Sequence, residues 1–560
     1  MAKKYCKQIF VLMAAALVFS GCKKPEENLA DALERIRAEE LSKNIQILAS
    51  DEFEGRGLAS KGEEKTINFL REEFEKIGLK PGNGQSFFQE VPMVRITADP
   101  DTKLTITSEK RSNFFSYGDE FVGLTLRIVP EVSLRNSDMV FVGYGIVAPE
   151  YNWNDYEGLD VHGKTVVILI NDPGFATNDP QLFNGKAMTY YGRWTYKYEE
   201  AARQGAAGAL IVHETEPAAY GWEVVRTGWT GPKFNLVSED KNLSRCALEG
   251  WIHLNTAKKI FEMDGKSFDK LKEPAAQRGF KAVPLNLKAS LTLKNSIDNL
   301  ESRNVIAVLP GSKRPDEYVF YMAHWDHFGI NPNLQGDQIF NGAVDNASGT
   351  AALIELAKAF KSLKSAPRRS LAFLSTTGEE QGLIGAQYYA THPIFLTTKT
   401  VAAINMDALN TYGQMKDITV VGYGNSELDA YVEAAAKEQG RRVRPDPRPE
   451  KGSYFRADHF AFAREGIPAI YVTSGIDHVK YGEAWTLEKM EKFVAEKYHK
   501  PSDEFDPNWD LSGAIDDLRL LFKVGYRLAM ESTFPNWKEG VEYKTKRDAE
   551  MAATKEKKSK

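Results

Sequence analysis

The spacing of hydrophobic positions changes along the chain, and each spacing predicts a different kind of element. From Asp31 to Leu79 apolar residues recur at helical intervals with charges between them, which predicts helices on the outside of a core. Residues 85–130 alternate between apolar and polar positions in the manner of strands. The segment Lys164–Ile170 contains a continuous apolar run that is typical of a strand buried on both faces. We interpret residues 131–285 as a compact module of their own.

From Asn304 onward, strand patterns and helix patterns alternate. The expected strands are Val319–Ala323, Leu371–Ser375, Val401–Met406, Ile418–Val421 and Pro468–Val472. The expected helices are Ser348–Leu363, Glu427–Glu438, Phe460–Arg464 and Asp517–Met530. Alternation of this kind predicts an α/β fold with a mostly parallel mixed sheet covered by helices on both faces. Such sheets bind their ligands outside the carboxyl ends of the strands.

Composition narrows the class of protein. The 560 residues carry 72 Lys and Arg against 77 Asp and Glu, a net charge of −5. This balance argues against nucleic acid as a partner, because no basic excess exists to displace counterions from phosphates. Three cysteines exclude a disulfide framework. The body of the chain has no apolar stretch long enough to span a bilayer as a helix.

The N-terminus predicts export and lipid attachment. Three early lysines precede an apolar run from Ile9 to Phe19, which is the layout of a secretory signal. The Ser-Gly-Cys that ends this segment resembles the processing site of bacterial lipoproteins, so we expect residues 1–21 to be removed and Cys22 to be acylated. The expected location is the bacterial cell envelope, with a membrane anchor through the N-terminal lipid and the protein facing the periplasm or the cell surface.

Acidic and imidazole side chains follow successive predicted strands. His324 ends one strand, and Asp326 shares its side of an extended backbone, so Asp326 suits the role of holding the imidazole. Further candidates follow in order along the chain: Asp345 before a helix, Glu379 and Glu380 after the next strand, Asp407 after a third, and His499 near the C-terminus. Because these strand ends meet at one edge of the sheet, we predict a metal site there.

Charge counting favours two divalent ions at this site. Asp345, Glu380 and Asp407 supply three negative charges, and a bridging hydroxide supplies a fourth, so two ions leave no net buried charge. Mixed imidazole and carboxylate ligands suit two Zn²⁺ ions, with other divalent metals such as cobalt or manganese as substitutes.

These residues together resemble a known family. The motifs His324-Trp325-Asp326, Asp345-Asn346-Ala347-Ser348-Gly349 and Glu379-Glu380, with Asp407 and His499, are similar to those of the co-catalytic zinc aminopeptidases related to aminopeptidase Y and glutamate carboxypeptidase II. Residues 131–285 resemble the protease-associated (PA) domain, an α+β module often inserted in these enzymes. Residues 51–56 resemble the opening of their peptidase domain. The resemblance covers nearly all of the chain after the signal segment.

The resemblance implies a role for each matching residue. Asp345 would bridge two zinc ions, with His324 and Asp407 on one ion and Glu380 and His499 on the other. Glu379 would be the general base, which takes a proton from water and passes it to the leaving amine. Tyr454 is similar in placement to a tyrosine that stabilises the tetrahedral oxyanion in some relatives.

Four further groups have competing interpretations. His478 is the alternative to His499 as the last ligand, and the His-Lys-Pro-Ser-Asp context favours His499. Asp458-His459 is expected to be structural and near the pocket. Trp325 and His327 either line a substrate cleft or pack in the interior.

The expected activity is that of a zinc-dependent aminopeptidase acting on peptides. Carboxypeptidase action on acidic dipeptides and glutaminyl cyclase chemistry are the alternatives, and a non-enzymatic docking protein is a fourth possibility that the full ligand set disfavours. A related group with an inserted dimerisation domain is excluded, because only 27 positions separate Glu380 from Asp407. The oligomeric state is left open. The expected domains are a signal peptide (1–21), a tether (22–30), a peptidase domain in two parts (31–130 and 286–543), the PA insert (131–285) and a charged, disordered tail (544–560).

Overall fold

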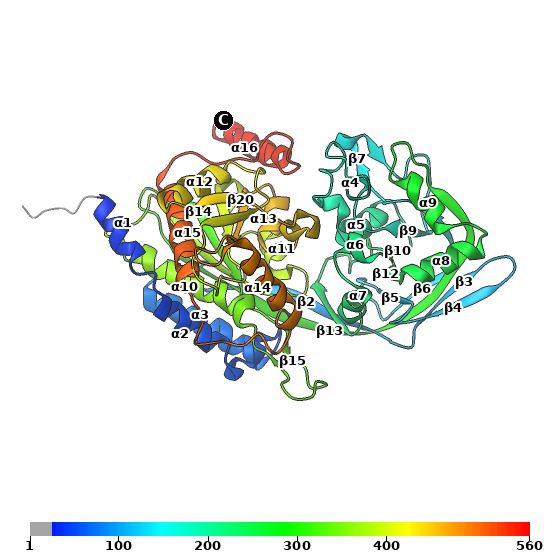
Figure 1. Cartoon of the computed structure of the whole chain (residues 1–560), viewed down its shortest axis with the longest axis horizontal. Coiled ribbons are helices and arrows are strands. Elements are labelled where there is room, and N and C mark those ends of the chain that lie inside the picture. Colours follow the sequence, from blue (N-terminus) through cyan, green and yellow to red (C-terminus); the bar gives the residue numbers. More distant parts are fainter. Residues whose placement is uncertain (1–24, 560) are drawn as a thin grey trace, which may run out of the picture.

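The computed structural model describes residues 25–559 and shows two lobes (Figure 1). The first lobe contains residues 25–98 and 295–559, and the second contains residues 99–294. The predicted signal segment and Cys22 lie outside the described residues. Among the helices that are described, none combines the length and apolar character that a bilayer crossing requires.

The first lobe is built on a mixed sheet whose centre is parallel. Strands β17 (Arg369–Thr376), β14 (Arg314–His324), β18 (Thr400–Asn405) and β21 (Ala469–Ser474) are parallel neighbours in that order. The sheet continues beyond β21 with β19 (Asp417–Val421) and β20 (Arg442–Pro445), and beyond β17 with the antiparallel β13 (Val283–Leu309) and β1 (Lys80–Pro81). The predicted fold class is confirmed.

Side chains of β14 alternate between two helical layers. Val319, Tyr321 and Ala323 pack in one apolar cluster, and Phe320 and Met322 pack in another on the opposite face. The first layer contains α2 (Ala38–Leu48), α3 (Lys61–Ile77), α10 (Ser348–Lys361), α12 (Leu428–Glu438) and α15 (Ser512–Met530). The second layer contains α11 (Ile384–Thr391) and α13 (His459–Arg464). Neither α11 nor α14 (Gly482–Glu496) was predicted from the sequence.

The second lobe has its own sheet, in which the predicted buried run forms β9 (Thr165–Leu169). The strands in spatial order are β4 (Ser112–Ser116), β3 (Lys103–Thr107), the first half of β13, β6 (Glu131–Phe141), β9, β10 (Gly208–His213), β12 (Leu248–His253) and β5 (Phe121–Leu124). Its helices are α4 (Pro173–Thr177), α5 (Trp194–Arg203), α6 (Thr215–Ala218), α7 (Trp222–Trp229), α8 (Leu254–Met263) and α9 (Phe268–Ala275). The lobe is therefore longer than the predicted insert of 131–285, because β3 to β5 pair with its strands.

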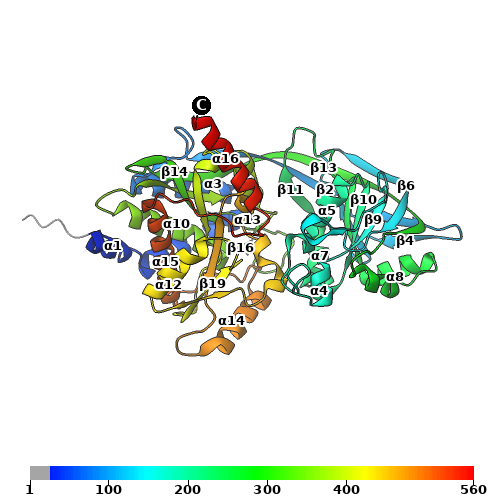
Figure 2. The same ribbon diagram turned by 90° about the horizontal axis from the view of Figure 1, so that it is seen from above.

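A continuous strand joins the two lobes. The second half of β13 pairs with β2 (Phe88–Ala98) from Asn295 opposite Ala98 to Val305 opposite Phe88. From the second lobe, β11 (Pro232–Leu236) adds to the other edge of β2. Figure 2 shows β2, β13 and β11 running between the lobes. This shared ribbon fixes the second lobe beside the first.

The predicted disordered tail is wrong, because residues 544–559 form helix α16 (Lys544–Ser559) on the first lobe. The buried guanidinium of Arg547 donates to the carbonyl oxygens of Thr397 and Thr400, each at 2.8 Å. Thr397 Oγ1 also donates to Glu550 Oε2 at 2.8 Å. Charge patterning alone does not reveal that one arginine in this segment anchors the helix. Likewise, α1 (Pro25–Leu33) covers most of the predicted tether.

We expect Arg547→Ala to lower the free energy of unfolding by about 2–4 kcal/mol, because two buried carbonyls lose a charged hydrogen-bond donor. Chemical denaturation monitored by circular dichroism measures this change. Arg226→Ala is the matched control, since Arg226 pairs with Glu223 at the surface and its loss should leave the free energy of unfolding almost unchanged. Equal effects of the two changes would show that α16 is not anchored in this way.

Candidate metal centre

The predicted ligands come from the carboxyl ends of neighbouring parallel strands. His324 is the last residue of β14, and Asp407 lies just beyond β18. Glu379 and Glu380 follow β17, whose residue Thr376 is in register with His324. Asp345 lies on the loop before α10. Parallel strands bring these ends to the same edge of the sheet.

A first group of atoms surrounds the imidazole of His324. Its Nε2 lies 3.3 Å from Asp345 Oδ1, 3.5 Å from Asp407 Oδ1 and 3.9 Å from Glu379 Oε2. This nitrogen is buried and has no hydrogen-bond partner. A buried ring nitrogen that faces three carboxylates without a hydrogen bond fits a metal ligand.

A second group shares Asp345 with the first. His499 Nε2 lies 3.2 Å from Asp345 Oδ2 and 3.2 Å from Glu380 Oε2. The two oxygens of Asp345 thus face different imidazoles, as a carboxylate that bridges two ions would. His499 follows α14 and has a φ of 57°, a left-handed conformation that non-glycine residues adopt at a cost and that is often found at functional sites.

Burial and mutual repulsion shift the pKa values of these carboxyls. Burial, with the neighbouring acids, raises the pKa of Glu379 and of Glu380 well above the usual range. Burial also acts on Asp345, but contact with His324 and His499 holds its pKa well below the usual value. Without a cation, the cluster therefore keeps protons on some of its members. A divalent ion would displace them, which is how metal binding couples to protonation.

Side-chain amides and carboxylates hold the loops that carry the ligands. Asn346 Nδ2 donates to the Met406 carbonyl at 3.1 Å, and its Oδ1 accepts from Ala408 N at 3.3 Å, so the residue links the loops of Asp345 and Asp407. Asp503 accepts from Val344 N at 3.2 Å and from Asp345 N at 3.1 Å. The position of the Asp345 carboxylate therefore depends on Asp503, which lies four residues after His499.

Asp326 lies beside the imidazole of His324, but its main-chain carbonyl, not its carboxylate, accepts the hydrogen bond from Nδ1, at 3.1 Å. It is buried, and its Oδ1 lies 3.7 Å from His324 Nδ1. The same oxygen accepts from Glu379 N at 3.1 Å. One carboxylate thus lies against both the imidazole and the backbone of the predicted base.

Arg56 is the buried cation behind the cluster. Its guanidinium donates to the carbonyl oxygens of Trp325 (2.9 Å), Leu48 (2.9 Å), Asn341 (2.6 Å) and Gly342 (2.8 Å). Burial lowers its pKa to about 10, so it stays charged at neutral pH. The sequence marked residues 51–56 only through a resemblance, and the structure shows that Arg56 ties together the loops around the ligands.

The predicted oxyanion donor is not brought to this centre. Tyr454 lies in an apolar cluster with Val421, Trp537 and Tyr543, and the acidic charges that act on it are those of Glu542 and Asp429. The residue that sequence reasoning missed is Tyr498. Its ring stacks on His499 with centroids 3.7 Å apart, and burial together with Asp345, Glu380 and Glu379 raises its pKa well above the usual value. Its position next to His499 in the sequence was the available signal.

The remaining candidates are buried residues outside the two groups of facing side chains described above. His478 accepts from Lys480 N and Tyr481 N and packs on Trp485, away from the ligands, so its geometry favours His499. Trp325 is buried and donates to the Arg303 carbonyl. Buried residues Asp458 and His459 lie behind the sheet edge, and Asp458 accepts a hydrogen bond from Thr376. His327 is also buried, and burial lowers its pKa to about 4.

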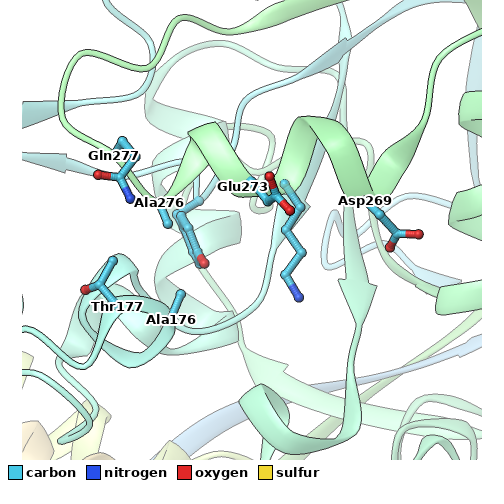
Figure 3. Close-up of a pocket in the computed structure, with 8 residues that line it drawn as sticks. Ala176, Thr177, Asp269, Glu273, Ala276 and Gln277 are labelled. Carbon is cyan, nitrogen blue, oxygen red and sulfur yellow. The ribbon is translucent and has the colours of Figure 1, made fainter.

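A cavity of about 640 Å³ lies in the second lobe between α9 and the α4 region (Figure 3). Its lining residues include Thr177, Asp269, Glu273 and Gln277, which are drawn there. None of the predicted site residues lines it, so it is separate from the metal centre.

We expect Arg56→Lys to lower the free energy of unfolding by about 3 kcal/mol and to weaken zinc binding, because an ammonium cannot satisfy four diverging carbonyls. Denaturation and competition with a chromogenic chelator measure the two effects. Arg95→Lys is the control, since Arg95 forms an exposed pair with Asp298. A variant with unchanged zinc affinity would contradict the role given to Arg56.

Comparison with known proteins also indicates a metallopeptidase for the segment that contains the ligand candidates. Residues 304–522 match the profile of Peptidase family M28. A probable zinc metalloprotease of Pyrenophora teres is 42% identical over 104 residues, which are 18% of this chain and 22% of that protein. The aminopeptidase NAALADL1 of mouse is 30% identical over 162 residues, 28% of this chain and 20% of that protein. The chain therefore spans about a fifth of the length of these relatives.

Other similarities extend further along the chain. Aminopeptidase YwaD of Bacillus subtilis is 25% identical over 232 residues, 40% of this chain and 44% of that protein. An aminopeptidase from Aneurinibacillus sp. strain AM-1 has a similar fold, with a TM-score of 0.51 and 20% identity over 90% of this chain and 97% of that one. The matched segment 304–522 contains all five predicted ligands and Glu379, and the chain therefore carries a domain of peptidase family M28.

Proposed function

We propose that the chain is a zinc-dependent exopeptidase that removes N-terminal residues from peptides. The observation that carries the proposal is the position of Asp345, whose two oxygens face His324 and His499 at 3.3 and 3.2 Å. This arrangement supports two zinc ions, one held by His324, Asp345 and Asp407 and the other by Asp345, Glu380 and His499. Two relatives are named aminopeptidases, which supports cleavage at the N-terminus of the peptide rather than at its C-terminus.

Zinc ions bound here would supply Lewis acidity toward a peptide carbonyl and a more acidic water molecule. The protein's own contribution begins with Glu379, whose Oε2 faces the same space as His324 Nε2. Its carboxylate takes a proton from the attacking water, and the hydroxide adds to the carbonyl carbon. Glu379 then passes the proton to the amine as the carbon–nitrogen bond breaks.

Tyr498 is positioned to help with the developing charge. Its phenol keeps its proton at neutral pH, because burial and the nearby acids raise its pKa. A neutral phenol stacked on His499 supplies a fixed hydrogen-bond donor beside the reacting carbonyl. In this proposal Tyr498 takes the role that the sequence assigned to Tyr454.

Contacts between the lobes support a preference for short substrates. Met188 N donates to the Pro449 carbonyl at 3.2 Å, and the ring of Tyr190 lies 5.1 Å from that of Phe460. Arg464 of the first lobe pairs with Glu199 of the second at 3.1 Å. The second lobe, which we propose to be a PA-type domain, therefore lies against the loop that leads toward the centre and would limit access of folded chains.

A second candidate activity is favoured by two arginines. Arg193 has a buried Nε without a hydrogen-bond partner, and burial with the charge of Arg456 lowers its pKa to about 10. Arg456 also acts on Tyr498, which stacks on the ligand His499. Arg193 and Arg456 are near enough for the charge of one to lower the pKa of the other, and two such guanidiniums suit the C-terminal carboxylate of a short peptide. This feature favours carboxypeptidase or dipeptidase action on the same centre.

The envelope location remains part of the proposal and rests on the sequence alone. The signal segment and Cys22 support a lipid-anchored protein that meets peptides outside the cytoplasm.

The direct test is a substrate panel measured on the protein as isolated, after chelation and after zinc is restored. It contains aminoacyl anilides, their N-acetylated forms, and dipeptides with free or amidated C-termini. We expect cleavage of the free-amine anilides, at least a hundredfold loss on chelation, and recovery with zinc. Cleavage that requires a free C-terminus instead would establish the second candidate. Zinc-independent cleavage would contradict both.

We expect Glu379→Gln to keep its zinc and to lose at least a hundredfold in kcat, because an amide cannot accept and return the proton. Metal content by mass spectrometry and steady-state kinetics measure the two quantities. Glu488→Gln on the exposed face of α14 is the matched control and should leave both unchanged. Retained turnover in the Glu379 variant would remove Glu379 as the base.

A further inference from the structure

His327 contacts one of the proposed ligands from inside the protein. Its Nδ1 lies 2.5 Å from Glu380 Oε1. The ring is buried, and its Nε2 has no hydrogen-bond partner. Once a metal ion is bound and Glu380 is ionised, its carboxylate can only accept a hydrogen bond, so the ring hydrogen then lies on Nδ1 and points at Oε1.

The surrounding backbone gives this ring a single position. A Cβ added to Gly342, which has a φ of +51°, would lie 2.5 Å from Cδ2 and 2.7 Å from Cγ of His327. His327 N donates to the carbonyl of Arg56 at 3.2 Å. The ring also packs against Phe328, with centroids 4.9 Å apart. The absence of a side chain at Gly342 therefore leaves room for an imidazole that is held from several sides.

The two oxygens of Glu380 consequently have different surroundings. Oε1 receives the hydrogen bond from His327, whereas Oε2 faces His499 Nε2 at 3.2 Å. A carboxylate can bind a metal ion through one oxygen or through both. An oxygen already engaged in a short hydrogen bond is a poor second ligand, and hydrogen bonds of this kind orient the ligands that they contact.

We propose that His327 is a positioning residue that reserves Oε1 of Glu380, so that Glu380 binds its metal ion through Oε2 alone and a coordination position stays open for substrate. This inference rests on the proposed metal centre. It also explains why the sequence places a second histidine three residues after the ligand His324. Catalytic zinc sites differ from structural ones in keeping such an open position.

Three variants separate the hydrogen bond from simple packing. His327→Leu fills the space without a donor, and His327→Asn retains an amide donor close to the place of Nδ1. His392→Leu is the matched control, because His392 is exposed and its ring contacts Thr391 and stacks on Tyr388, neither of which belongs to the metal centre. Each protein is loaded with cobalt or zinc, and its fold is checked by circular dichroism.

The readouts are the visible absorption of the cobalt protein, the affinity of the weaker ion in chelator competition, and kcat against KM. In His327→Leu, Oε1 of Glu380 would be free to bind the ion as a second oxygen and would raise its coordination number. Because a higher coordination number weakens the visible absorption of cobalt, we expect weaker absorption from this variant. We also expect a 10–100-fold loss of affinity and a similar fall in kcat with little change in KM. His327→Asn should recover most of each quantity.

Two results would overturn the inference. One is a cobalt spectrum and metal affinity in His327→Leu that match those of the unchanged protein. The other is a His327→Asn variant whose cobalt spectrum and metal affinity are as impaired as those of His327→Leu, which would assign His327 to packing alone. If the leucine variant misfolds, the asparagine variant is compared with the unchanged protein instead, and a large loss in it would still overturn the inference. If the unchanged protein binds metal but cleaves no peptide, the proposed function fails, and the spectral comparison still decides the role of His327.

Discussion

The need to neutralise buried carboxylates at one edge of the sheet governs the arrangement of this protein. The ends of β14, β17 and β18 and the loop before α10 bring Asp345, Glu379, Glu380 and Asp407 within a few ångströms of His324, where burial makes their negative charges costly. Only cations can make such a cluster stable in its charged form. Arg56 supplies one positive charge from within the chain, but its four hydrogen bonds go to backbone carbonyls and none goes to a carboxylate of the cluster. The remaining charge is the reason for a metal centre.

The same constraint explains how the loops are tied. Asn346 links the Asp345 loop to the Asp407 loop, and Asp503 links it to the segment of His499. His327 Nδ1 is hydrogen-bonded to Oε1 of Glu380, the oxygen that does not face His499. Asp345, Glu380 and the Asp407 loop are thus each held by a neighbour on another loop. A cluster of repelling groups needs these links, because without them the loops would separate to relieve the repulsion.

Sequence reasoning predicted the elements whose signals are local. Apolar runs gave the central strands, and the order of acids and histidines after those strands gave the ligands that now converge. The position of Tyr498 on His499 was missed, because a family pattern drew attention to Tyr454, which packs in an apolar cluster. Residues 544–560 were expected to be disordered because they are highly charged. One buried arginine in this segment, Arg547, instead anchors it to the first lobe as helix α16.

The extent of the second lobe was harder to predict for a physical reason. Alternating strands in residues 85–130 fit either sheet equally well, and only pairing with β12 and β13 assigns β5 and β3 to the second lobe. The 27-residue β13 belongs to both lobes, so no loop marks the boundary on that side.

The most direct test of the central claim is an anomalous difference map at the zinc edge from crystals of the zinc-loaded protein. We expect two peaks, each about 2.0–2.2 Å from its ligand atoms. One lies between His324, Asp345 and Asp407, and the other between Asp345, Glu380 and His499. A single peak, or a peak bound by His478 in place of His499, would contradict the account.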